Sequence, residues 1–383
     1  MIKRFSVSNF KSIKSVNVDF SDITVLVGRS GTGKSNFLRA IQFFRNLIIG
    51  DGCRNRIGSN FPATFEKSEQ NTSMRFEIEF AISGMNSNYV YSIELNNTVT
   101  KQEKLSLGDD ILFHRIGRTQ AGRGFVPAQW SVEPQVVNLP SVNDSSLAIR
   151  QLSELQEVVI AYSALSSGIS FYDFPDTVLT TPKSQPASVS GLSENAENYV
   201  EVLRDMSMDL RDLTVRKRMV EALKRVNSTV TSVELDNIVS PRCVTVGHEF
   251  DGKVLSLPLV KQSVGFRRFY AHLLALYQKP AKLCMMFEHP EDGIHPGAMQ
   301  LLAEEFKAAA QEDRGQIVFT THNPRLLDQF DADSIRVVDI NGFNTRIGPV
   351  SAEQREAIDD ALLDTGELLT SDPARLDEAS RKR

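Results

Sequence analysis

The sequence predicts an α/β protein with a mixed sheet, and three observations predict it. An apolar run at residues 23–27 leads into a glycine-rich turn and then an amphipathic helix at 36–49. Apolar and polar residues alternate between residues 74 and 95, which indicates antiparallel strands. From residue 260 to 340, helical patterns alternate with short apolar runs, and this rhythm is typical of parallel strands covered by helices.

The other elements follow from the same patterns. Strands are expected at 2–7 and 16–20, a Pro-, Ser- and Thr-rich loop at 173–193, and a helical stretch at 194–226. In the second half we expect helices at 260–277, 297–310 and 324–329 and strands at 282–287, 316–320 and 334–340. We expect one composite domain: a nucleotide-binding α/β lobe of residues 1–170 and 278–350, a helical lobe of residues 190–277, and a C-terminal helix and tail at 351–383.

Composition limits the cellular setting. Of 383 residues, 41% are hydrophobic and 24% are charged, as in ordinary soluble proteins. No apolar run reaches the roughly 18–20 residues that a membrane span needs, and the N-terminal residues lack signal-peptide features. The three cysteines, Cys53, Cys243 and Cys284, show no paired spacing, so we expect reduced thiols in a cytoplasmic protein without membrane attachment.

The net charge of −5 argues against a globally basic nucleic-acid-binding surface. Basic residues do gather in one segment: Arg204, Arg211, Arg216, Lys217, Arg218, Lys224 and Arg225. Two readings stay open for this segment. A solvated helix face is the favoured one, and contact with DNA is the other.

The glycine-rich turn carries the clearest motif in the chain. Residues 28–35 fit the pattern G-x-x-x-x-G-K-[ST] completely, with a buried strand before them and a helix after them: Gly28, Arg29, Ser30, Gly31, Thr32, Gly33, Lys34 and Ser35. Glycines let backbone amides turn around a β-phosphate, and the helix N-terminus adds a positive dipole end. Lys34 would reach the β- and γ-phosphates, and the hydroxyl of Ser35 would coordinate Mg²⁺. A guanine-reading N/T-K-x-D motif is absent from the sequence, so ATP is the expected nucleotide.

A second motif, Ser263-Val-Gly265-Phe-Arg-Arg, precedes a predicted apolar strand. It resembles the signature motif of the RecF/SMC/OLD group of ATP-binding-cassette ATPases. In that group the Ser hydroxyl and the Gly amide contact the γ-phosphate held by the other subunit. The alternative is an ordinary N-capping serine, and the other motifs favour the signature.

The segment Glu288-His-Pro-Glu-Asp-Gly-Ile-His-Pro296 follows an apolar strand and resembles the family pattern D-E-P-E-x-x-L-H-P. The resemblance places Glu288 at the Walker B aspartate, which helps to hold Mg²⁺, and His289 at the catalytic glutamate. His295 and Pro296 then fall in the segment that crosses the dimer interface. A histidine at 289 leaves several readings open: His289 is the base, Glu288 or Glu291 serves instead, or hydrolysis is slow, which we favour. A register in which Glu288 is the catalytic carboxylate is less favoured.

Two further residues complete the resemblance. His322 follows an apolar strand, as the switch histidine of the family does, and Lys11 lies in a segment similar to the basic opening motif of RecF and SMC heads. The chain thus resembles these proteins over residues 1–50 and 255–350. The implied fold is a P-loop NTPase of the cassette type, with a mixed sheet, an antiparallel β subdomain and a helical lobe.

The resemblance also implies a function. Such heads close head to tail around ATP and Mg²⁺, so we expect a homodimer or a higher even-numbered assembly. Stand-alone heads resemble the ATPase subunits of bacterial anti-phage systems, which act beside a separate nuclease or toxin. The alternative is a DNA-stimulated, RecF-like repair ATPase. A transporter subunit is disfavoured because the signature is not L-S-G-G-Q, and a Toprim nuclease is not expected.

Overall fold

The structure is a computed structural model, and it divides into two compact units, each treated below by itself. It describes residues 1–50, 65, 73–95, 100–116, 120–121, 124–125, 129–131, 147–181, 191–208, 212–236 and 243–377. The first unit comprises Met1–Ile169, Ala332–Leu363 and Pro373–Arg383, and the second comprises Ser170–Asp331 and Asp364–Asp372. No helix in the described ranges has the length and apolar character that a membrane crossing requires.

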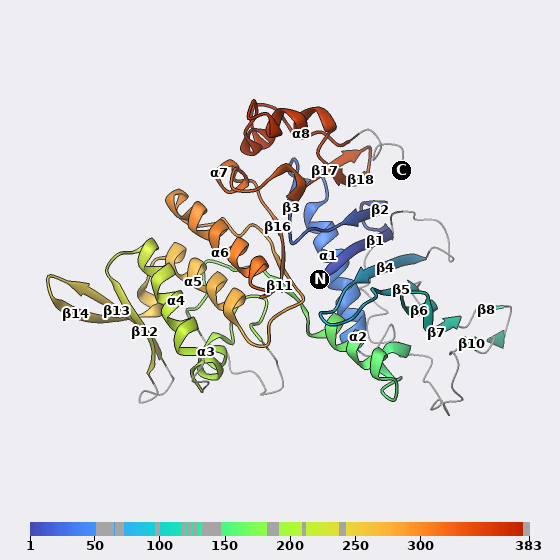
Figure 1. Cartoon of the computed structure of the whole chain (residues 1–383), viewed down its shortest axis with the longest axis horizontal. Coiled ribbons are helices and arrows are strands. Elements are labelled where there is room, and N and C mark those ends of the chain that lie inside the picture. The colour runs from blue at the N-terminus through green and yellow to red at the C-terminus, as the bar shows by residue number, and fades with distance from the viewer. Residues whose placement is uncertain are drawn as a thin grey trace. The chain divides into compact units, whose positions relative to one another are not determined.

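The first unit contains a seven-stranded antiparallel sheet in the order β10-β7-β6-β5-β4-β1-β2 (Figure 1). Its strands are β1 (Ile2–Phe10), β2 (Ile13–Asp19), β4 (Met74–Phe80), β5 (Tyr89–Leu95), β6 (Thr100–Leu107), β7 (Asp110–Ile116) and β10 (Gln129–Ser131). Alternation of buried and exposed residues produces the strands, since every second side chain faces the core. The predicted strands between 74 and 95 are confirmed; β6 and β7 were not expected.

Helix α1 (Lys34–Ile49) packs against one face of this sheet through aromatic side chains. Phe37 and Phe44 are fully buried, with ring centroids 6.0 and 5.8 Å from that of Phe5. Full burial of one such side chain stabilises a fold by about 1.5–3 kcal/mol. A second helix, α2 (Gln156–Ser166), packs beside α1 in the same unit. This packing fixes the first turn of α1, where the predicted phosphate-binding residues lie.

A smaller group of strands in the first unit supports the glycine-rich turn. Strand β3 (Ile23–Val27) is buried along its whole length and pairs in parallel with β17 (Ile335–Asn341). Strand β17 forms a hairpin with β18 (Asn344–Pro349), and α8 (Ala352–Asp359) follows. Strands β3 and β17 and the C-terminal helix match the sequence prediction, whereas β18 was missed.

The second unit combines short buried strands with helices. Its elements include β11 (Ile169–Tyr172), α3 (Tyr199–Met208), α4 (Asp212–Val226), α5 (Val264–Tyr277), β15 (Cys284–Phe287), α6 (Met299–Gln311), β16 (Gln316–Thr320) and α7 (Pro324–Leu327). Strands β15 and β16 are parallel. The ring of Phe306 on α6 lies 5.0 Å from Phe287 and 5.4 Å from Phe319, so the helix is anchored on both strands.

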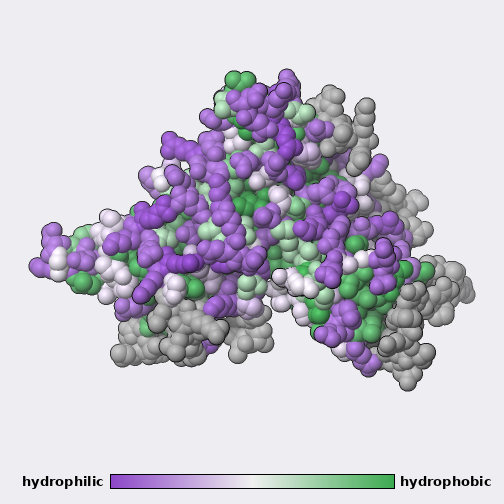
Figure 2. All heavy atoms as spheres, in the orientation of Figure 1, coloured by the Kyte–Doolittle hydropathy of each residue, from purple (hydrophilic) through white to green (hydrophobic). Residues whose placement is uncertain are grey.

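The predicted helical lobe is interrupted by strands. Residues 230–258 form a three-stranded antiparallel sheet of β12 (Val230–Asp236), β13 (Cys243–Phe250) and β14 (Lys253–Pro258). Exposed apolar side chains of Phe250, Val254 and Leu255 hid the alternation that a half-buried strand normally shows. Figure 2 shows apolar atoms at the surface of this sheet. The grouping of residues 278–350 with 1–170 in one nucleotide-binding lobe stays a prediction.

Candidate functional site

The glycine-rich turn between β3 and α1 has the backbone that a phosphate cradle requires. Gly31 and Gly33 have φ values of 80° and 109°, a left-handed region that only glycine adopts readily. A Cβ atom at Gly33 would collide with Thr345, and one at Gly28 would collide with the carbonyl of Val338. Arg29, Ser30 and Gly31 are exposed at the rim. Positive φ values at successive glycines are typical of turns whose backbone amides can surround a phosphate group.

Lysine 34 lies inside this cradle. Its side chain is buried, and its ammonium group donates to the carbonyls of Gly28 at 2.8 Å and Arg29 at 3.0 Å. Ser35 follows in the first turn of α1 and is half-buried. A point charge in the loop and a hydroxyl at the helix start are the donors that a triphosphate and its Mg²⁺ need.

A series of hydrogen bonds connects the glycine-rich turn and the first turn of α1 to β18. The amide of Asn36 donates to the Ser12 hydroxyl at 2.8 Å, and that hydroxyl lies 2.8 Å from the hydroxyl of Thr345. Thr345 in turn donates to the carbonyl of Thr32 at 2.8 Å. Thr345 is fully buried, so these bonds are shielded from water.

Lys11 lies in the turn between β1 and β2, next to Ser12. Its φ of 50° is unusual for a residue with a side chain. Burial, and then repulsion from Arg39, lower the pKa of Lys11. Because Ser12 is bonded to Asn36, the structure places Lys11 in a turn attached to the first turn of α1.

In the second unit, a cluster of His and Glu side chains follows β15 and β16. The rings of His289 and His322 stack with centroids 4.8 Å apart. Nδ1 of His289 lies 3.7 Å from a carboxylate oxygen of Glu291, and the backbone amide of His322 donates to that same oxygen at 2.7 Å. The structure thus brings together two of the three predicted catalytic residues, with Glu291 between them.

The charges of this cluster are coupled. Interaction with the carboxylate of Glu291 raises the pKa of His289, although burial opposes the shift. Burial acts to raise the pKa of Glu291, but bonds from His289 and His322 outweigh it and lower the pKa. A carboxylate facing Nδ1 favours the tautomer with the proton there, which leaves Nε2 as a proton acceptor. His289 can therefore act as a base when it is neutral.

The predicted signature serine begins α5. Its hydroxyl accepts from the backbone amide of Phe266 at 3.2 Å, which is N-cap geometry. A Cβ atom at Gly265 would come within 2.6 Å of the carbonyl of Gly293, so only glycine fits there without a shift. Ser263 and Gly265 line a pocket of about 790 Å³, which His295 also lines. Ser263, Gly265 and His295 thus lie around one pocket at the N-terminus of α5.

A protein-family model matches most of the chain and shows to which family it belongs. The model describes an "AAA domain, putative AbiEii toxin, Type IV TA system" and matches residues 23–328, which include the cradle, the signature and both histidines.

The chain belongs to this AAA-domain family.

Its relatives extend the resemblance. A protein named "OLD nuclease" from Thermus scotoductus is 20% identical over 349 residues; the match covers 88% of the chain and 62% of the relative. An SMC head bound to the C-terminal winged-helix domain of ScpA has a TM-score of 0.58 at 15% identity, with 92% of the chain and 99% of that structure covered. An SMC head from Pyrococcus furiosus bound to the C-terminal domain of ScpA gives 0.56 at 13% identity, with 94% and 99% covered. The predicted P-loop fold and RecF/SMC/OLD-like class are confirmed, and the AAA-domain protein is an ATPase of this type.

The structure adds one acidic residue that sequence reasoning missed. Asp173 follows β11, and the backbone amide of Glu288 donates to the carbonyl of the residue before it, Tyr172, at 3.0 Å. Burial raises the pKa of Asp173, and the charge of Glu288 raises it further. Its position after a short strand was the available signal, because ligands of α/β sheets bind beyond strand ends. Asp173 and Glu288 are thus close enough for their charges to interact, and the described residues contain no group of three or more His, Cys, Asp or Glu side chains that could hold a metal ion.

Three of the seven residues of the basic segment form ion pairs in the described part of the second unit. Arg218 pairs with Glu312 at 2.9 Å and Arg225 with Glu304 at 2.6 Å, and both glutamates belong to or adjoin α6. Arg204 lies 3.5 Å from Asp205. Arg211 lies outside the described residues. Arg218 and Arg225 stay about half exposed in these pairs, in line with the favoured interpretation of a solvated helix face, and DNA contact stays a prediction.

Proposed function

We propose that this chain binds ATP and Mg²⁺, closes head to tail with a second copy, and acts as a nucleotide-gated switch for a separate effector in anti-phage defence. The observation that carries the proposal is that one chain holds two anion-binding helix N-termini, that of α1 with Lys34 and that of α5 with Ser263. A γ-phosphate needs both, and a head-to-tail dimer supplies one from each copy.

The roles of the residues follow from their chemistry. The amides of residues 28–33 and the ammonium group of Lys34 bind the phosphates, with Lys11 near the same turn. Ser35 and Glu288 offer the hard oxygen ligands that Mg²⁺ prefers. The ion would neutralise phosphate charge when it is bound. Ser263 and Gly265 present a hydroxyl and an amide to the γ-phosphate held by the partner copy.

Hydrolysis depends on His289 in this proposal. With its Nδ1 directed at Glu291, the neutral ring offers Nε2 to an attacking water, and His322 stacks on the same ring. An imidazole with a raised pKa is protonated over more of the neutral pH range than an unperturbed one. We therefore propose slow turnover, so that the ATP-bound dimer persists long enough for an effector to read it.

The effector is a separate protein in this proposal. The matched family description names a toxin and a toxin–antitoxin system, and the curated relative is named a nuclease. The chain spans 62% of the length of that relative, so a nuclease activity is not carried over to it. A nuclease or toxin partner supports the switch better than catalysis by this chain.

A mixing experiment tests the head-to-tail site. Lys34→Ala disables the cradle, and Ser263→Arg blocks the signature, so neither variant alone can build a complete site. A one-to-one mixture should regain up to about half of wild-type turnover, because only a mixed dimer has an intact site and one of its two sites is intact. Mixtures that stay as inactive as the separate variants would overturn the head-to-tail arrangement.

The second candidate is a DNA-stimulated ATPase of RecF-like repair. It predicts that duplex DNA raises turnover severalfold at neutral pH. The switch predicts tight ATP binding and little turnover with or without DNA. Measured phosphate release with and without duplex DNA separates the two.

A further inference from the structure

An aromatic side chain lies exposed at the tip of the β17–β18 hairpin. Asn341 pairs with Asn344, so Gly342 and Phe343 form a two-residue turn, in which Gly342 has the left-handed φ of 63° that such a turn needs. The ring of Phe343 is 88% exposed. The turn explains the glycine but not the aromatic residue. Single exposed apolar residues are common, so the position of Phe343 decides whether it has a role.

This hairpin lies directly against the phosphate cradle. The carbonyl of Val338 on β17 fills the space beside Gly28, and the side chain of Thr345 on β18 fills the space beside Gly33. A strand rises about 3.3 Å per residue, so Phe343, two residues before Thr345, lies about 7 Å along the hairpin from this contact. The tip of the hairpin is therefore a direct neighbour of the cradle.

The end of the cradle beside Thr345 is the end that faces the nucleoside. In a loop of this type the lysine reaches the β- and γ-phosphates, and backbone amides bind the α- and β-phosphates. The ammonium group of Lys34 lies at the carbonyls of Gly28 and Arg29, which indicates the γ-phosphate end. The α-phosphate and the nucleoside then lie toward the opposite end, beside Gly33 and the first turn of α1.

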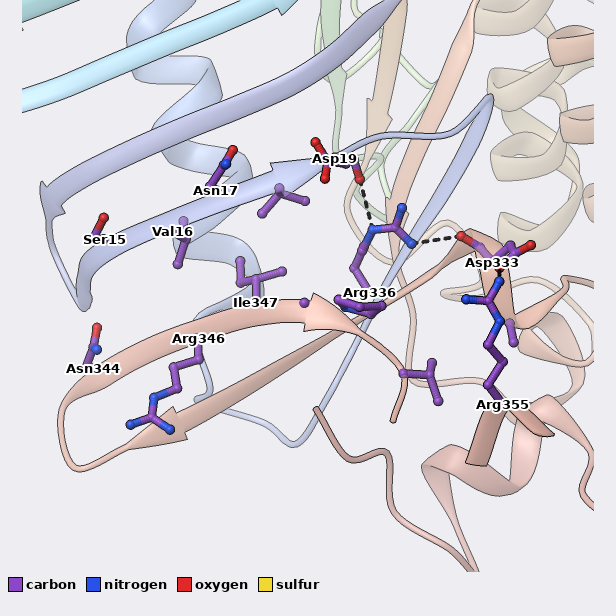
Figure 3. A pocket seen from close by; sticks show the side chains of 15 residues that line it. Ser15, Val16, Asn17, Asp19, Asp333, Arg336, Asn344, Arg346, Ile347 and Arg355 are labelled. Atoms are coloured by element: carbon purple, nitrogen blue, oxygen red, sulfur yellow. Dashed lines mark hydrogen bonds and ion pairs between the residues drawn. The ribbon is translucent and has the colours of Figure 1, made fainter. Parts of the chain in front are cut away.

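Two turns of the first unit border this end of the cradle. The side-chain amide of Asn36 on α1 donates to Ser12 of the β1–β2 turn at 2.8 Å, and Ser12 lies 2.8 Å from Thr345 of the hairpin. The turns also contact each other, because the backbone amide of Lys14 donates to the side chain of Asn344 at 3.0 Å. Figure 3 shows Asn344 near the tip of the hairpin, beside β2. A nucleoside that leaves the cradle at this end meets these two turns.

Of the two aromatic side chains on these turns, Phe343 is the one that a ligand can reach. Phe10 of the β1–β2 turn is 1% exposed and packs against the rings of Phe43 and Phe76, with centroids 5.7 and 6.0 Å away. Phe343 instead presents a flat apolar face to the outside, and such a face is what a nucleobase stacks on.

We propose that the ring of Phe343 stacks on the adenine base of the nucleotide held in the cradle. The proposal rests on ATP binding by residues 28–35, and it depends neither on the head-to-tail dimer nor on an effector. Stacking on an aromatic ring tolerates any base, so Phe343 adds affinity for the nucleoside without selecting adenine over guanine. The hairpin thus serves the nucleotide at two points, since Thr345 supports the phosphate-binding turn and Phe343 covers the base.

The test compares a ligand that has a base with one that has none. Isothermal titration calorimetry measures binding of adenylyl imidodiphosphate, a nonhydrolysable ATP analogue, and of inorganic tripolyphosphate, both with Mg²⁺. Ser263→Arg serves as the parent, so that binding is separated from the closure of two copies. Phe343→Ala should weaken the analogue about 5- to 150-fold, because losing one stacked base costs about 1–3 kcal/mol. Tripolyphosphate should bind as it does to the parent.

Leu362→Ala is the matched control, because Leu362 is another exposed apolar side chain of the first unit; it should leave both affinities unchanged. Phe343→Trp supplies a second measurement. Tryptophan keeps an aromatic face, so the affinity should be retained, and the analogue but not tripolyphosphate should quench the added fluorescence. The chain has one tryptophan of its own, Trp130, and the parent gives its background signal.

Two results would overturn the proposal. If Phe343→Ala binds the analogue as tightly as the parent does, the ring does not contact the base. If the variant loses affinity for the analogue and for tripolyphosphate equally, it disturbs the cradle and the base plays no part. A parent that binds neither ligand would instead refute the ATP site of residues 28–35, and this proposal would fall with it. Because the ring of Phe343 is exposed, its removal should leave thermal unfolding unchanged.

Discussion

Removing the hydroxyl of Thr345 should loosen the phosphate cradle without touching it directly. Valine has nearly the same shape as threonine but can neither donate to the carbonyl of Thr32 nor accept from Ser12. In the structure both bonds are 2.8 Å long and Thr345 is fully buried, so the Thr32 carbonyl would be left without a partner away from water. An unpaired buried group of this kind costs about 1–3 kcal/mol.

The cost of the unpaired carbonyl should also reduce the free energy of ATP binding, because ATP must bind to a cradle that is less firmly held. Since about 1.4 kcal/mol corresponds to a tenfold change in affinity, ATP should bind Thr345→Val roughly 5- to 150-fold more weakly. Calorimetric titration with ATP measures the affinity, and urea unfolding measures the stability. We expect the free energy of unfolding to fall by about 1–3 kcal/mol.

The matched control is Thr345→Ser, which keeps the hydroxyl and removes only a methyl group. It should lose about 0.5–1.5 kcal/mol of stability, as deletion of one buried methyl does, while ATP affinity stays close to wild type. If Thr345→Val binds ATP and unfolds like the wild-type protein, the hydrogen-bond chain does not support the cradle and this reasoning is refuted.

Three further predictions concern the proposed switch. Lys34→Ala should abolish ATP-dependent dimerisation measured by light scattering, and a dimer that persists would count against the ATP sandwich. His289→Glu should raise turnover in a phosphate-release assay if the histidine makes hydrolysis slow; equal or lower turnover would contradict that. Because His289 accepts a proton only when neutral and its pKa lies above the ordinary 6.5, turnover should rise with pH through a midpoint above that value. Glu291→Gln removes the carboxylate and should move this midpoint downward; an unmoved midpoint would exclude His289 as the base.

The sequence predicted best those parts of the fold that local patterns determine. Strand β3, the cradle and α1 follow from one apolar run, three glycines and a helical repeat, and all lie within 27 residues of one another, from Ile23 to Ile49. The N-cap at Ser263, predicted as the alternative to a signature serine, is equally local, since its partner Phe266 is three residues away. Local chemistry of this kind does not depend on the rest of the chain.

Contacts between distant residues could not be predicted in this way. Thr345 bonds to Thr32 across 313 positions, and a single buried threonine in a strand has no pattern of its own. Strand β18 was missed because its role depends on pairing with β17. The β12–β14 sheet was missed because exposed apolar side chains such as Val254 made its alternation irregular.

The backbone at His289 bears on why a histidine occupies this position. Its φ of 46° lies in the left-handed region, where histidine, asparagine and aspartate are several-fold enriched over other non-glycine residues. The backbone amide is held there by the hydroxyl of Thr320 at 3.1 Å, so the turn fixes the direction of the side chain. Glutamate at this position would face Glu291, which now pairs with the imidazole, and two carboxylates at that distance repel each other. His289→Glu should therefore lower the free energy of unfolding even where it raises turnover. If both effects are found, His289 stabilises the cluster at the cost of faster hydrolysis. If turnover rises without any loss of stability, His289 does not stabilise the cluster.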